Sequence, residues 1–263
     1  MTVTSHADPP AFFVPDGDRF IPTDRARGPW NPESLSGWVM MGLLAHATEA
    51  HRPEGFHVAR LTVDMFRPPP FAPASVTTEV VRSGSRIRIV DAVLTVDGQD
   101  VARSTATMLR FGDVPEGTIW EAPPSSIPAP ESVPAVEGTN ARARSWDIRH
   151  VGGPMGQAGR RIAWLRQTAP LIEGTETSAF VRLATQSDYT NPFANSGDRG
   201  LVYINADVTL YLHRPVEGEW LGLEVTSHRA EQGIALGLCR VYDRRGEAGY
   251  TAASAISNRL RGR

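Results

Sequence analysis

The chain contains no lysine, since all 27 of its basic residues are arginine, and this excludes Schiff-base chemistry on a lysine side chain. It has a single cysteine, Cys239, which excludes an internal disulfide and a cysteine-built metal site and is typical of a reducing compartment. Cys239 has apolar neighbours, so we expect a buried packing thiol. No apolar run approaches the roughly 18 residues of a membrane span, and the first ten residues lack the basic and apolar regions of a secretory signal. These absences predict a soluble, cytoplasmic protein.

An excess of charge is also missing. The net charge of −2 gives no electrostatic footprint for nucleic acid or for an anionic membrane. No group of histidine, cysteine and carboxylate residues has ligand spacing, so we expect neither a metal nor a redox cofactor. The hydrophobic fraction of 41% and the charged fraction of 21% are instead typical of a globular protein, and 263 residues suffice for one large domain or two ordinary ones.

In the first half the sequence predicts two short strands around an Asp-Gly turn, at residues 12–14 and 19–22, then one helix and a run of strands. Asn31 is a suitable N-cap with Pro32 in the first turn, and Leu35, Val39 and Leu43 then recur at helical spacing. Four β-rich runs follow, at residues 58–67, 74–82, 86–96 and 101–111, with a hairpin turn at 97–98. This order predicts an α+β fold with an antiparallel sheet.

The second half repeats the same order. Strands are predicted at residues 145–151 and 160–168, a helix at 179–191, and further strands at 202–214, 221–229, 234–243 and 248–256. A proline-rich segment separates the two halves and is expected to be an extended linker. The predicted division is a mobile tail at 1–10, a first unit at 11–112, the linker at 113–144 and a second unit at 145–263.

One strand shows the duplication most directly. Aligning residues 59–68 with 206–215 superposes the two Arg-Pro pairs, and it places Thr62 on Thr209 and Arg60 opposite Asp207. A carboxylate within such an apolar, β-rich strand is costly to bury unless it is hydrogen-bonded or functional. Because only one copy carries it, we predict that the two halves divide the function.

Several segments together carry a family resemblance: Trp146-Asp-Ile-Arg149, Trp164-Leu-Arg166, residues 184–194, Ile204-Asn-Ala-Asp-Val-Thr-Leu-Tyr-Leu-His-Arg-Pro215 and Glu219-Trp-Leu221. They resemble the acyl-CoA thioesterase II (TesB-like) double-hotdog family, in particular its actinobacterial branch. The resemblance implies a tandem hotdog α+β fold, in which each unit has a long helix wrapped by a curved antiparallel sheet. It further implies an acyl-CoA substrate, paired halves and a homodimer.

The same resemblance implies a site. A strand aspartate, a polar residue on the next strand and a glutamine near the C-terminus orient water in this family, and these positions fall at Asp207, His228 and Ser254, with Ala253 equally possible for the last. No glutamine follows Gln232, so the third position departs from the family pattern. Backbone amides at a helix N-terminus can hold the oxyanion, and Ser36 and Gly37 are the candidates.

Two alternatives remain open. A duplicated hotdog without its glutamine could bind an acyl group or acyl-CoA without hydrolysing it. The segment from Ser187 to Ala194 is also similar to the motif of hotdog enoyl-CoA hydratases, but Asp188 lies one residue too far from Asn191-Pro192, and alanine replaces the histidine. For Arg67 and Arg214, structural salt bridges are favoured over binding of the coenzyme A phosphates.

Overall fold

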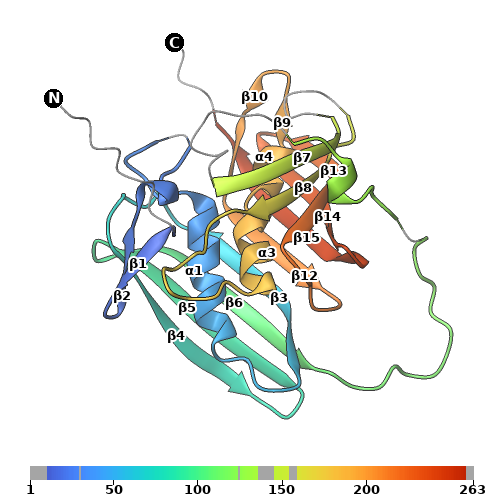
Figure 1. Ribbon diagram of the computed structural model, residues 1–263, viewed down its shortest axis with the longest axis horizontal. Coiled ribbons are helices and arrows are strands. Elements are labelled where there is room, and N and C mark those ends of the chain that lie inside the picture. The colour runs from blue at the N-terminus through green and yellow to red at the C-terminus, as the bar shows by residue number, and fades with distance from the viewer. Residues whose placement is uncertain (1–10, 30, 124, 136–144, 154–158, 259–263) are drawn as a thin grey trace.

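The computed structural model describes residues 11–29, 31–123, 125–135, 145–153 and 159–258 (Figure 1). The predicted tail at 1–10 and residues 136–144 of the predicted linker therefore lie outside the described residues. None of the described helices is long and apolar enough to span a membrane.

The first half folds as a strand pair, a helix and four further strands, of which β4, β5 and β6 form a meander and β3 pairs with β6. Its elements are β1 (Phe13–Asp16), β2 (Arg19–Pro22), a 3-10 turn (Asp24–Ala26), α1 (Gly37–Glu49), β3 (Phe56–Met65), β4 (Ala74–Ser83), β5 (Ile87–Val96) and β6 (Gln99–Arg110). Residue Asp97 and the following glycine both have positive φ in the β5–β6 hairpin, as expected for a two-residue turn.

The second half repeats this order with additions between its helix and its last strands. Its elements are a 3-10 turn (Pro130–Ser132), β7 (Trp146–Gly152), β8 (Ile162–Gln167), α3 (Ala179–Ser187), α4 (Thr190–Ala194), β9 (Ser196–Gly197), β10 (Gly200–Leu201), β11 (Tyr203–Asn205), β12 (Asp207–Leu212), β13 (Trp220–Glu231), β14 (Ile234–Asp243) and β15 (Gly246–Ser257).

Both halves contribute to a single 13-stranded sheet. Its order is β1-β2-β4-β5-β6-β3-β12-β15-β14-β13-β8-β7, with β11 also paired to β15. The order reads the same from either end when β7, β8, β12, β13, β14 and β15 replace β1, β2, β3, β4, β5 and β6, so a pseudo-two-fold axis passes between β3 and β12. Thr62 and Thr209 are cross-strand partners at this axis, as the aligned strands suggested, and their hydroxyl groups lie 3.3 Å apart.

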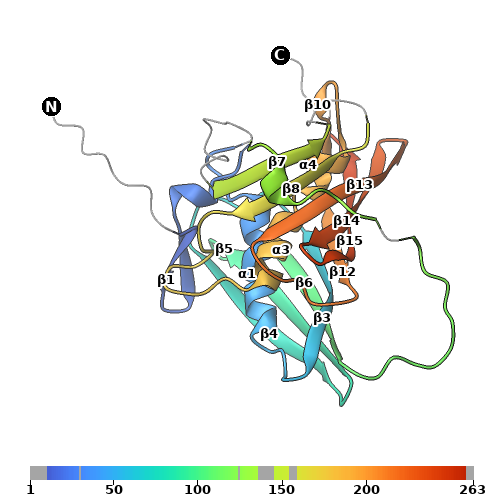
Figure 2. The same ribbon diagram turned by 45° about the vertical axis from the view of Figure 1, so that its right-hand side comes forward.

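The two long helices lie side by side within the curve of this sheet (Figures 1 and 2). Alternate residues of the sheet face them: Val208, Leu210 and Leu212 of β12 are buried, whereas the residues between them are partly or fully exposed. Helix α1 is buried over most of its surface because the sheet covers one side and α3 the other. A Cβ on Gly42 would lie 2.7 Å from the Thr185 hydroxyl, so this glycine permits close approach of α3.

Two predicted helix boundaries are wrong. Helix α1 begins at Gly37 with Ser36 as its cap, not after Asn31, because the amides of Leu35 and Ser36 bond to the carbonyls of Pro69 and Ala26. Asn31 instead closes a turn, accepting from the amide of Glu33 at 3.0 Å.

The predicted second helix is divided into α3 and α4 around residues 188 and 189, so the Asn191-Pro192 pair lies inside α4 and does not end a helix. Proline is tolerated there because it lies in the first turn, where an amide has no intrahelical partner.

Part of the predicted linker packs on the second half. Trp164 donates from Nε1 to the Pro128 carbonyl at 2.7 Å, and Arg149 donates to the Pro130 carbonyl at 2.8 Å. Ile127 lies against Gly222, where any Cβ would be 2.8 Å from it. The segment therefore covers the face of β8 and β13 that points away from the helices, where Trp164, Trp220 and Tyr242 form a second, smaller core.

Candidate functional site

A carboxylate lies against the first turn of α1. The Oδ2 and Oδ1 atoms of Asp188 are 2.7 and 2.8 Å from the position that a Cβ on Gly37 would occupy, so only glycine fits here without displacing the carboxylate. Ser36, the cap residue, makes no side-chain capping bond. The first turn of a helix presents unpaired amides and the positive end of the helix dipole, which favour an anion. Asp188 lies at the C-terminal end of α3, so the two halves meet at this point.

The pseudo-two-fold axis relates this contact to a second one, between the C-terminal end of α1 and the N-terminus of α3. Glu49, at the C-terminal end of α1, accepts a 2.6 Å hydrogen bond from Ser178, which caps α3. A cavity of about 230 Å³ with a mostly apolar lining adjoins it. The two carboxylates differ in their surroundings. Asp188 is hydrogen-bonded to a series of asparagine side chains, whereas Glu49 has no such series among the described residues.

Three asparagines connect Asp188 to His228. Asn205 donates from Nδ2 to Asp188 Oδ1 at 3.1 Å, and Asn191 donates to Asn205 Oδ1 at 3.3 Å. Asn195, the C-cap of α4 and one helical turn beyond Asn191, donates to Asn191 Oδ1 at 2.9 Å. Asn195 Oδ1 lies 2.8 Å from Nδ1 of His228. All donors in this chain point toward Asp188, an arrangement in which each bond polarises the next and stabilises the carboxylate.

This chain of hydrogen bonds, called the polar chain below, also determines the tautomer of His228. An amide oxygen can only accept, so Nδ1 of a neutral His228 carries the proton and Nε2 is left with its lone pair. His228 lines a cavity of about 820 Å³ beside β13. Strand β13 pairs with β8 as far as Glu224, and the next amide, that of Val225, donates to the Arg161 carbonyl. Among the described residues β8 does not pair with β13 beyond this point, and the cavity lies beside these later residues of β13. The polar chain thus runs from the α1 N-terminus to the wall of a large cavity.

The structure brings two of the sequence-predicted residues together. Ser254 donates both its backbone amide, at 3.1 Å, and its hydroxyl to Oδ1 of Asp207. The pairing of β15 shifts by one residue between Asn205 and Thr209, which marks a β-bulge at Ala206 and Asp207. Asp207 is half-buried on the face of the sheet that points away from the helices, because its neighbour Val208 is fully buried on the other face.

His228 does not join this pair. Cross-strand partners share a face, and His228, Gly237 and Ala253 are partners in one row, which α4 covers. Ser254 belongs to the neighbouring row on the opposite face. Among the described residues no contact connects His228 with Asp207 or Ser254, so the three predicted positions do not form one cluster. Ala253, the alternative for the third position, is the residue that shares the face of His228.

Ser36 and Gly37 do lie at a helix N-terminus, as predicted, but next to Asp188 and not next to Asp207. Sequence reasoning noted Asp188 only within a hydratase-like motif, and it missed Asn195 and Asn205. The available sign was the spacing of Asn191 and Asn195, four residues apart, which places two amides one helical turn from each other.

Two other expectations concern single residues. Cys239 is fully buried, and burial raises the pKa of its thiol, so it does not act as a nucleophile. Arg214 forms a bidentate ion pair with the buried Asp243 at 2.6 and 2.7 Å, which confirms a structural salt bridge. Arg67 bonds to the neutral Gln99 at 3.0 Å instead. The described residues contain no group of histidines, cysteines and carboxylates arranged to hold a metal ion.

Substituting Gly37 tests the contact between the halves. We expect Gly37→Ala to lower kcat/KM for the acyl-CoA thioester that the family resemblance implies by about 10²-fold, because a methyl group at this position displaces the Asp188 carboxylate by the order of an ångström. Alanine is the better helix former, so Tm should change little. Steady-state kinetics and thermal unfolding measure the two effects separately. An unchanged kcat/KM would show that the Asp188–Gly37 contact has no part in the reaction.

The fold and sequence match known thioesterases. A family model described as the acyl-CoA thioesterase N-terminal domain matches residues 26–109, and one for the C-terminal domain matches residues 121–251. A search of curated protein sequences finds no match.

Solved structures show the same fold at low identity. An acyl-CoA thioesterase II, TesB2, from Mycobacterium marinum is 18% identical with a TM-score of 0.65, and the alignment covers 86% of this chain and 91% of that one. The TesB protein of Mycobacterium avium subspecies paratuberculosis is 16% identical with a TM-score of 0.68, covering 91% and 92%. A hotdog-fold protein from Alicyclobacillus acidocaldarius is 16% identical with a TM-score of 0.73, covering 94% and 95%. The predicted double-hotdog fold is therefore confirmed, and the chain belongs to the acyl-CoA thioesterase family and is a thioester hydrolase.

Proposed function

We propose that the chain hydrolyses acyl-CoA thioesters at the N-terminus of α1, with Asp188 as the base that activates water. The observation that carries this proposal is the packing of the Asp188 carboxylate against Gly37, which places a base beside unpaired backbone amides. Thioester hydrolysis requires both groups, a base for water and donors for the developing oxyanion. Asp188 and Asn205 are only partly buried, so water reaches them.

The proposed reaction begins at the carbonyl group of the thioester. The thioester carbonyl oxygen accepts from the backbone amide of Gly37 in the space beside the carboxylate, since the Ser36 amide already bonds to the Ala26 carbonyl. Asp188 takes a proton from water as the water oxygen bonds to the carbonyl carbon. The negative charge that develops on the carbonyl oxygen is stabilised by the helix N-terminus. The C–S bond breaks as the tetrahedral intermediate collapses, and the thiolate of coenzyme A leaves and takes up a proton. Asn205 holds the carboxylate in place through its 3.1 Å bond.

Asp207 has a different part in this proposal. Its carboxylate accepts the amide of Ser254 that the β-bulge leaves without a ladder partner, and so it stabilises the bulge. The bulge is what turns Asn205 toward the helices while Asp207 faces the other way. Asp207 is therefore a positioning residue that acts through Asn205.

Release of free thiol from a panel of acyl-CoAs, from short to long chains, tests the proposed function. We expect steady release with at least one chain length. Binding of acyl-CoA without release would instead indicate an acyl-CoA-binding protein. A loss of absorbance on an enoyl-CoA with no thiol released would indicate a hydratase, and either result would contradict the proposal.

A further inference from the structure

The cavity of about 820 Å³ beside β13 is distinct from the carboxylate at the α1 N-terminus. Its walls come from the Arg160–Arg161 segment, the end of α4 and residues 224–228 of β13. Neither Asp188 nor Gly37 lines it, but His228 and Asn195 do, and they belong to the polar chain that ends at Asp188. The cavity has the size of a small-molecule site. The hydrogen bonds of the polar chain connect its wall, at His228, to Asp188.

The described lining of this cavity is rich in guanidinium groups. Arg160, Arg161 and Arg240 line it, against one carboxylate, that of Glu224. Arg161 is buried and donates to the carbonyls of Phe193 and Ser196 at 2.5 and 2.6 Å, so it fixes the α4 wall. A cavity lined mainly by one sign of charge concentrates ligands of the opposite sign, so this one favours an anion.

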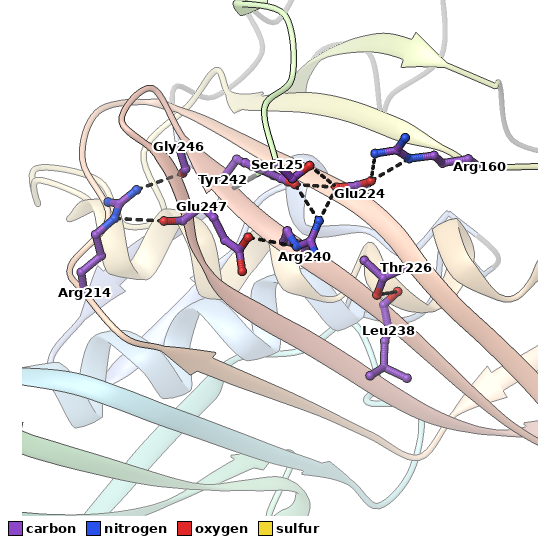
Figure 3. A network of polar contacts seen from close by, with 10 residues as sticks. All are labelled: Ser125, Arg160, Arg214, Glu224, Thr226, Leu238, Arg240, Tyr242, Gly246 and Glu247. Atoms are coloured by element: carbon purple, nitrogen blue, oxygen red, sulfur yellow. Dashed lines mark hydrogen bonds and ion pairs between the residues drawn. The ribbon is translucent and has the colours of Figure 1, made fainter. Parts of the chain in front are cut away.

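Glu224 holds the other two arginines in place (Figure 3). Its side chain is buried, and it accepts from Arg160 Nε at 2.7 Å, from Tyr242 at 2.5 Å and from Arg240 at 3.3 Å. Burial by itself would raise the pKa of Glu224, but the bonds from Tyr242 and Arg160 and the charges of Arg160 and Arg240 lower it overall. The carboxylate is therefore ionised at neutral pH, and it orients both guanidinium groups at the cavity wall.

Arg160 still has donors to offer. Both of its bonds to Glu224 use Nε and Nη2, which leaves Nη1 without a partner among the described residues, and the side chain is 63% exposed. Guanidinium is the group best suited to phosphate, which it can bind through two parallel hydrogen bonds. The cavity also has an aromatic wall, in which the rings of Tyr203 and His228 lie 6.0 Å apart. A flat ring of this kind can stack on a nucleotide base.

We propose that this cavity binds the nucleotide of coenzyme A, with Arg160 at a phosphate group and the Tyr203 ring beside the adenine. The inference rests on the proposed function, since it assigns one end of the substrate to the cavity and the thioester end to the α1 N-terminus. The group that the cavity would recognise is a phosphorylated adenine nucleotide. A coenzyme A thioester carries this group and a pantetheine thioester does not.

Kinetics with two matched substrates test this inference. The same acyl group is offered as its coenzyme A thioester and as its pantetheine thioester, to the wild type and to the Arg160→Gln and Arg229→Gln variants. We expect the wild type to prefer the coenzyme A thioester. In Arg160→Gln the ratio of the two kcat/KM values should fall about tenfold, the usual effect of losing a hydrogen bond to a charged group. Arg229 is exposed on β13, the strand that carries His228, but it does not line the cavity, so the ratio in Arg229→Gln should stay at the wild-type value.

Two kinetic results would overturn the assignment. An Arg160→Gln variant that loses activity on both thioesters equally would show general damage to the site. A wild type that does not distinguish the two thioesters would show that the nucleotide is not recognised, and would point to substrates carried on the phosphopantetheine arm of a protein.

A calorimetric titration of coenzyme A and of pantetheine separates this inference from the proposed function. If the wild type hydrolyses no thioester but binds coenzyme A about tenfold more tightly than Arg160→Gln does, the cavity assignment stands and the proposed function fails. Equal binding of coenzyme A by the wild type and by Arg160→Gln overturns the cavity assignment whether or not hydrolysis is observed.

Discussion

Replacing Asp188 by asparagine is expected to lower kcat/KM for an acyl-CoA thioester by roughly 10³-fold, or about 4 kcal/mol of transition-state stabilisation. The asparagine keeps the size of the side chain and can still accept from Asn205, but it cannot take a proton from water. The variant should fold, because the loss of a carboxylate at a helix N-terminus costs only about 1 kcal/mol. Thiol release and thermal unfolding of the same preparation give both quantities.

Asp207→Asn is the matched control for Asp188→Asn, since both replace an aspartate by asparagine. Asp207 lies two residues beyond Asn205 in sequence, but on the face of the sheet that points away from the helices. We expect a decrease of less than about tenfold, because the amide oxygen of asparagine still accepts from the Ser254 amide and holds the bulge. The opposite ranking, with Asp207→Asn inactive and Asp188→Asn active, would assign the base to Asp207 and contradict the mechanism proposed above.

The sheet could be predicted almost completely from the sequence. Most of the long strands alternate or run apolar over residues rich in valine, isoleucine and threonine, and the predicted strand at 234–243 agrees with β14 at both ends. The two-residue strands β9 and β10 have no such pattern and were not predicted. The duplication was visible in β3 and β12, the two strands that pair with each other at the axis. Thr62 and Thr209 superpose in the alignment and face each other in the structure.

The start of α1 was not predictable from local preference. Asn31 and Pro32 have the composition of a helix start, but the amides that would enter the helix bond instead to carbonyls at Ala26 and Pro69. The latter bond joins residues far apart in the chain. Tertiary partners thus override capping preference, which is worth only about 1 kcal/mol.

The candidate site was hidden for a related reason. Counting residues back from the Arg-Pro pair assigns Asp207, and the count is correct, but the bulge at Ala206 reverses which residues face the helices. A bulge of one residue moves the following side chains to the opposite face of the sheet, and no sequence pattern here indicated the bulge. Asn205, on the helix-facing side, therefore takes part in the inner polar chain, whereas Asp207 faces the opposite side.

The largest effect on stability is expected at Asp243. Its side chain is fully buried at the β14–β15 turn, where it accepts two bonds from Arg214 and the backbone amides of Glu217 and Arg245. Every neighbour is a donor, so the amide nitrogen of an asparagine would face donors and leave Arg214 without its counter-charge. We expect Asp243→Asn to lower the free energy of unfolding at pH 7 by about 3–5 kcal/mol. In contrast, Asp16→Asn removes an ion pair to Arg19 that is more than half exposed, and should cost less than about 1 kcal/mol.

The contribution of the Asp243–Arg214 pair to the free energy of unfolding should depend on pH. Burial alone would raise the pKa of Asp243, but the bonds from Arg214, Arg245 and Glu217 and the charge of Arg214 lower it overall. A carboxyl whose folded pKa lies below its unfolded value of about 3.9 stabilises the fold at higher pH and loses that contribution as the pH falls through the folded pKa. Urea unfolding of the wild type should therefore show a decrease in stability below about pH 4, and the difference from Asp243→Asn should shrink over the same range. A difference that stays constant down to pH 2 would show that packing at the turn, and not the charge of Asp243, stabilises the second half.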